Sequence, residues 1–169
     1  MSDAILGQII VGATALVSGS VGLLAGFLTE RWRAHSAREA RSEARQDQRD
    51  EYQRQTLLES QEAISRFGSV VWTIHGNDIK GDQATGTWSR TRFAGATNEE
   101  FISALLRLQM LTARVQDDEL RRLVTGYYNR GVLVTTAASK KEAGTRMDDW
   151  IERLGEVQDR LGSVLRDFV

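Results

Sequence analysis

Two histidines, His35 and His75, are the first residues to consider for metal binding or acid–base chemistry. Imidazole ligands in helices usually come in sets at fixed spacing, such as a second histidine at i+4. Neither histidine has such a neighbour. We interpret His35 as a residue of a charged helix, His75 as a residue at a helix end, and both as surface side chains.

Two acidic clusters could bind a hard cation such as Mg²⁺ or Ca²⁺, because these ions prefer oxygen ligands. Asp117, Asp118 and Glu119 form the first cluster, and Asp148 and Asp149 form the second. Each cluster also stands where we expect the first turn of a helix, where negative charge is favourable. We prefer this second interpretation and predict no metal site.

Motifs of common enzymes are missing from the chain. It contains no G-x-x-x-x-G-K-[ST] phosphate loop, no G-x-G-x-x-G segment after a strand and no G-x-S-x-G nucleophile elbow. Tyr127 and Tyr128 lie on an otherwise apolar segment and are more simply explained as a core residue and a rim residue. We therefore predict a protein that is not an enzyme and binds no cofactor.

The amino-acid composition excludes further classes of protein. The 169 residues include 22 Lys and Arg against 23 Asp and Glu, and the net charge of -1 argues against a nucleic-acid partner. Cysteine is absent, so disulfides and thiolate metal ligands are excluded. Proline is absent as well, which favours long uninterrupted helices and an all-α fold.

An apolar run without charge, Ile5 to Leu28, stands near the N-terminus. A helix needs about 20 apolar residues to cross a bilayer, so we predict a transmembrane anchor at residues 1–29. A cleaved signal peptide is the alternative, but no Lys or Arg precedes the run and no small-x-small cleavage site follows it. Arginines collect only after the run, and loops rich in Lys and Arg usually stay on the cytoplasmic side. We therefore predict a protein of the bacterial inner membrane, with its N-terminus outside and the bulk of the chain in the cytoplasm.

Small residues within this run recur at alternating three and four positions and therefore share one helix face. Such a face lets two membrane helices approach closely, which is a main source of association in lipid. We predict self-association of the span through this face. Its residues are Gly12, Ala15, Gly19, Gly22 and Gly26.

A charged helical stalk is predicted at residues 30–56. Arginines follow one face, carboxylates lie nearly opposite, and Ala37 and Ala44 lie on the face between them. In a parallel homo-oligomer with the alanine face as its seam, each helix presents arginines to the carboxylates of its neighbour. A solvated spacer is the alternative, since charged runs are usually solvated faces.

Apolar residues at helical spacing dominate residues 57–169. They predict an up-down bundle of about four helices, the first continuing from the stalk as far as Gly76 and Asn77. A capping box, Thr97 with Glu100, marks the start of the next helix. We expect Val132–Thr136 to be helical rather than a strand, and Lys140–Thr145 to be a turn before a last helix. That last helix has the clearest repeat in the chain, which comprises Met147, Trp150, Leu154, Val157, Leu161, Val164 and Phe168.

A long loop is predicted at residues 75–97. Loops of this length in a compact domain are uncommon and are often functional. Trp88, Arg90, Arg92 and Phe93 are the candidate contact with a partner protein. The alternative, which we prefer, is that Trp88 and Phe93 fold back on the bundle as a lid.

The sequence thus predicts a single-pass membrane-anchored scaffold or interaction protein. Its expected partners are the lipid bilayer, other copies of itself in a parallel homo-oligomer, and another protein. A membrane-active oligomer, such as a pore or a phage or defence-system effector, is the second hypothesis. A sensor that binds a small ligand between its helices is the third.

Overall fold

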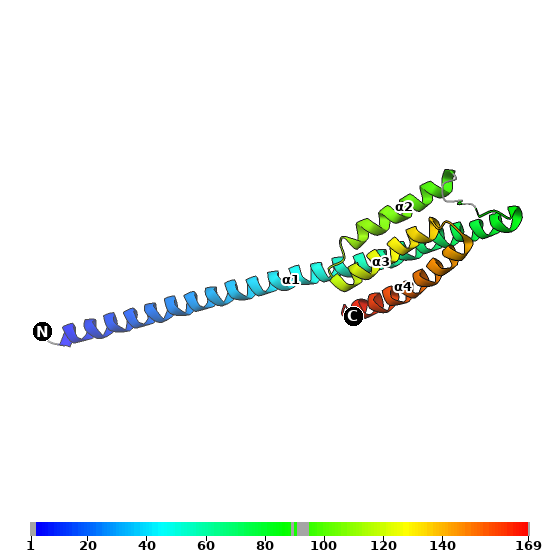
Figure 1. Ribbon diagram of the computed structural model, residues 1–169. Coiled ribbons are helices and arrows are strands. Elements are labelled where there is room, and N and C mark those ends of the chain that lie inside the picture. The colour runs from blue at the N-terminus through cyan, green and yellow to red at the C-terminus, as the bar shows by residue number, and fades with distance from the viewer. Residues whose placement is uncertain (1–2, 89, 91–94, 169) are drawn as a thin grey trace. The chain divides into compact units, whose positions relative to one another are not determined.

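The computed structural model describes residues 3–88, 90 and 95–168, and for residues 3–38 it describes the backbone alone. The described chain forms four α-helices and no strand. Their order is α1 (Asp3–Thr85), α2 (Gly95–Thr112), α3 (Asp118–Thr135) and α4 (Lys140–Arg166) (Figure 1). The prediction of an all-α protein is confirmed, and so is the helical state of Val132–Thr135 within α3.

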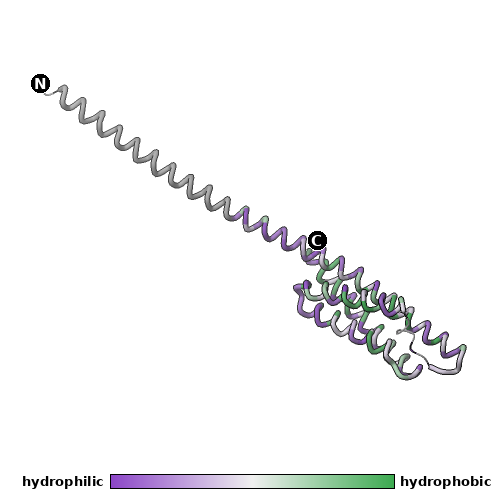
Figure 2. The backbone as a smooth tube through the Cα atoms, turned by 90° about the horizontal axis from the view of Figure 1, so that it is seen from above, coloured by the Kyte–Doolittle hydropathy of each residue, from purple (hydrophilic) through white to green (hydrophobic). Residues whose placement is uncertain are grey.

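The chain divides into two compact units, residues 1–48 and residues 49–169. Helix α1 is continuous through both. In the first unit, the side chains described, residues 39–48, are exposed. They are predominantly hydrophilic (Figure 2). Among the described residues, no helix is long and apolar enough to cross a membrane; the side chains of the span predicted at residues 1–29 lie outside that description.

The second unit begins earlier than the boundary predicted at residue 57. Gln53 and Thr56 are buried, with 5% and 4% of their surface exposed. The Gln53 side chain donates a hydrogen bond to the Arg114 carbonyl (3.3 Å) and accepts one from the Gln116 backbone N–H (3.2 Å). Sequence periodicity missed this turn of helix because its buried side chains are polar.

Helix α1 also ends later than predicted. It passes Gly76 and Asn77, because Ile74 and Asp78 beside them are both buried on its inner face. Tertiary packing outweighs the roughly 1 kcal/mol that a glycine costs in a helix. The helix ends at Thr85, before Gly86 with φ +69°, a conformation that glycine adopts without strain. The long loop predicted at 75–97 is therefore helical over its first part, and its shorter remainder lies between Thr85 and Gly95.

The predicted starts of two helices are wrong. Helix α2 begins at Gly95, so Thr97 lies inside it, and Glu100 pairs with Arg66 of α1. Helix α4 begins at Lys140, within the predicted turn. Ser139 accepts a hydrogen bond from the Glu142 N–H (3.2 Å), while the Glu142 carboxylate accepts one from the Ala138 N–H (2.6 Å). This arrangement resembles a capping box, except that Glu142 binds the N–H of the residue before the N-cap Ser139; its Ser-x-x-Glu pattern is the signal that the sequence analysis overlooked.

The helices of the second unit run alternately up and down. Pairing of Arg107 with Glu59 (3.1 Å) and of Glu100 with Arg66 sets α2 antiparallel to α1. Helix α4 is likewise antiparallel to α3, since Arg160 near its end reaches Asp117 at the start of α3. Figure 1 shows these helices side by side. The predicted up-down bundle is confirmed.

An aromatic cluster forms the centre of the bundle. Phe67 of α1 lies 5.8 Å from Tyr127 of α3 between ring centroids, edge to face, and Tyr127 stacks on Trp150 of α4 at 5.2 Å. The Tyr127 hydroxyl donates a hydrogen bond to the Ile64 carbonyl (3.3 Å). Burial raises the pKa of Tyr127 well above its ordinary value, because the phenolate would lose its hydration. The apolar repeat predicted in α4 supplies Met147, Trp150, Val157, Leu161 and Val164 to this core.

Candidate functional site

The first acidic cluster, Asp117 to Glu119, is engaged by arginines. Asp117 pairs with Arg160 through two hydrogen bonds of 3.1 and 2.5 Å, Asp118 pairs with Arg121, and Glu119 pairs with Arg122 at 2.6 and 2.9 Å. Asp117 also accepts a hydrogen bond from the Leu120 N–H (2.7 Å) as the N-cap of α3. These carboxylates stand at the start of α3, as the preferred interpretation predicted, and Asp117 also ties that helix to α4.

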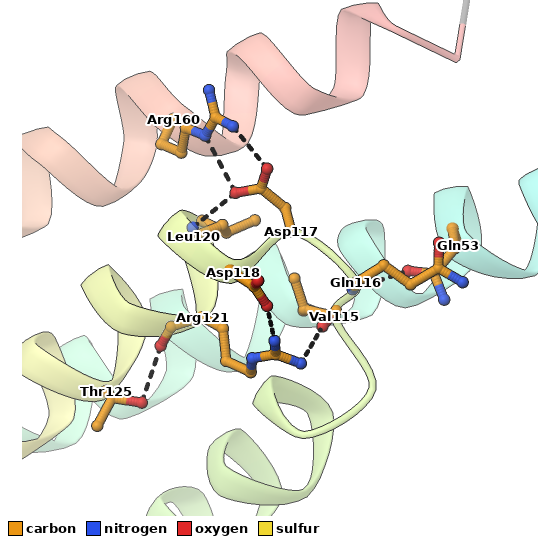
Figure 3. A network of polar contacts seen from close by, with 9 residues as sticks. All are labelled: Gln53, Val115, Gln116, Asp117, Asp118, Leu120, Arg121, Thr125 and Arg160. Carbon is orange, nitrogen blue, oxygen red and sulfur yellow. Dashed lines mark hydrogen bonds and ion pairs between the residues drawn. The ribbon is translucent and has the colours of Figure 1, made fainter.

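Several hydrogen bonds and ion pairs meet at the turn from α2 to α3 (Figure 3). The hydrogen bond from Arg160 is the main reason that the pKa of Asp117 is lowered, and the Leu120 N–H adds to it. On the other side of the turn, Arg121 donates to the Val115 carbonyl (3.2 Å). Gln53 closes the network from α1. The arrangement fixes a turn and holds no open ligand position, so we interpret it as structural.

The second acidic cluster lies in the interior of α4, because that helix begins at Lys140. Our placement of Asp148 and Asp149 in a first turn is therefore wrong. Asp149 borders a small charged hollow of about 130 Å³ that Arg130 and Arg153 also line. Among the described residues, no group of three potential ligands could hold a metal ion.

His75 is half-buried and lies within α1. We predicted a surface residue at a helix end, and that prediction is wrong. Burial lowers its pKa because the charged imidazolium loses hydration, and the negative charge of Asp78 opposes this effect in part. Asp78 is itself buried. The side chain of His35 lies outside the described residues.

The connection after α1 folds back on the bundle. The indole N–H of Trp88 donates a hydrogen bond to the Ala137 carbonyl between α3 and α4 (3.0 Å), and Lys140 pairs with Asp82 at 3.1 Å. Trp88 is half-buried and Arg90 is exposed. The hydrogen bond to Ala137 holds Trp88 against the bundle, as expected of a lid. Arg92 and Phe93, the other two candidate partner contacts, lie outside the described residues.

Of the residues predicted to form the oligomer interface, the structure describes the side chain of one, Ala44. Ala44 is exposed on α1 and available to a neighbouring chain. The side chains of Gly12, Ala15, Gly19, Gly22, Gly26 and Ala37 lie outside the described residues.

Large apolar side chains on the bundle surface were not anticipated. Ile102, Leu106 and Met110 on α2 are 45%, 52% and 56% exposed. Their i, i+4, i+8 spacing places them along one side of the helix. We call this set the outer face of α2. The signal was present in the sequence, since α2 carries apolar residues at more positions than one buried stripe requires.

A ligand pocket between helices would be needed for the sensor hypothesis. The hollow between α1 and α4, lined by Ile64 and Leu161 among others, has about 190 Å³. The hollow between α1 and α2, beside Arg66 and Glu100, has about 180 Å³. Both are smaller than the roughly 300 Å³ at the lower end for small-molecule sites, so neither supports that hypothesis.

Compared with models of protein families, with curated proteins and with solved structures, the chain matches none.

Proposed function

We propose that this chain is a single-pass scaffold or interaction protein of the bacterial inner membrane, with its N-terminus outside and its helical bundle in the cytoplasm. The observation that carries the proposal is the continuity of α1. This one helix of 83 residues contains the uncharged apolar run Ile5–Leu28 and also supplies Phe67, Val71 and Ile74 to the bundle core. A helix shared by an anchor and a domain holds the domain at the membrane for a partner protein.

Membrane attachment and its direction can be tested together. The tagged protein should remain in the membrane pellet after extraction with alkaline carbonate, since only an inserted span resists it. Protease added to spheroplasts should leave the bundle intact. Extraction into the supernatant would refute the anchor, and digestion of the bundle in intact spheroplasts would refute the orientation.

Self-association in a parallel homo-oligomer is part of the proposal. It is supported by Ala44, which is exposed, and by arginines at 41 and 45 and acids at 43 and 47, all exposed on the described part of the first unit. Replacing Gly19 and Gly22 by Leu should reduce crosslinked species in membranes, because leucine side chains keep two backbones apart. Replacing Ile9 and Val21 by Leu adds no such bulk and serves as the control. Equal crosslinking in both variants would exclude the glycine face as the interface.

The partner protein is the remaining part of the proposal. Affinity purification of the tagged full-length chain from membranes should recover a second protein in stoichiometric amount. Recovery of this chain alone would remove the support for a scaffold.

A membrane-active oligomer is the second candidate, favoured by the glycine-rich spacing of the span. Against it, the span offers few polar side chains to line a conducting path, chiefly Gln8, Thr14, Ser18 and Ser20. Purified protein added to dye-loaded liposomes distinguishes the candidates. Dye release would favour the membrane-active oligomer, and retained dye with intact insertion would exclude it.

A further inference from the structure

We draw no further inference here: the strongest candidate, the exposed apolar outer face of α2 formed by Ile102, Leu106 and Met110, carries none because nothing in the structure shows what covers it.

Discussion

The ring of Phe67 lies so close to Gly131 that a methyl group on that glycine would come within 2.5 Å of the ring atom Cε1 and 2.8 Å of Cζ. Phe67 is fully buried and cannot move aside. Helices α1 and α3 approach one another at this point because position 131 has no side chain. The glycine is therefore a packing requirement of the aromatic cluster.

Replacing Gly131 by Ala should destabilise the fold by about 1 to 3 kcal/mol, the usual cost of adding a methyl group to a filled core. Chemical denaturation followed by circular dichroism measures the change. Gly144→Ala in α4 is the control, since its added methyl group meets no atom within 4 Å. The control should gain about 0.5 to 1 kcal/mol from helix propensity. A neutral Gly131→Ala would contradict the close approach of α1 and α3.

Gln53 should matter more than an ordinary polar residue of a charged helix. Gln53→Ala leaves the Arg114 carbonyl and the Gln116 N–H without their partner, and unsatisfied groups of this kind cost about 1 to 3 kcal/mol. Gln55→Ala, at an exposed position of the same helix, should be nearly neutral. Equal unfolding free energies for the two variants would place Gln53 outside the cooperative unit.

Asp117 combines a cap and an ion pair, and two substitutions separate them. Asp117→Ala removes both and should cost about 1 to 2 kcal/mol, the usual loss of an N-cap. Asp117→Asn keeps a capping oxygen and loses only the charge facing Arg160, so it should cost less than about 1 kcal/mol. Thermal unfolding of both variants against the parent chain measures the difference. Equal losses of stability in the two variants would mean that the ion pair, not the cap, dominates.

Trp88 should act as a structural clasp between the end of α1 and the α3–α4 junction. Trp88→Phe keeps an apolar ring but removes the N–H donor to the Ala137 carbonyl, and the net loss of such a hydrogen bond is about 0.5 to 1.5 kcal/mol. Trp72→Phe is the control, because Trp72 is exposed on α1. Loss of partner binding at unchanged stability in Trp88→Phe would instead assign Trp88 to an interface.

His75 should make stability depend on pH near neutrality. Its pKa in the folded chain lies below the unfolded value of 6.5, so its contribution is fully present above 6.5 and is lost as the pH falls through the lower folded pKa. Between about pH 7.5 and about pH 5, the unfolding free energy of the parent chain should therefore fall more than that of His75→Gln. Parallel curves for the two proteins would mean that His75 is not desolvated.

The sequence by itself determined the helical class, the up-down order and most of the core. Its apolar residues repeat at helical spacing in α3 and α4, and no proline interrupts them. Five residues of the predicted α4 repeat are buried, because the spacing of an amphipathic helix largely decides which of its sides faces the core; Leu154 and Phe168 are only partly buried, and the buried Ala143 lay outside the repeat.

Tertiary structure decided what local signals could not. Helix α1 passes Gly76 because Ile74 and Asp78 are buried against other helices, and the bundle starts before Leu57 because Gln53 binds the distant turn after α2. Which of the two apolar sides of α2 remains open to solvent was decided only by the packing of the bundle against the other side. Each of these outcomes depends on contacts between residues far apart in the chain, which a pattern of neighbours does not encode.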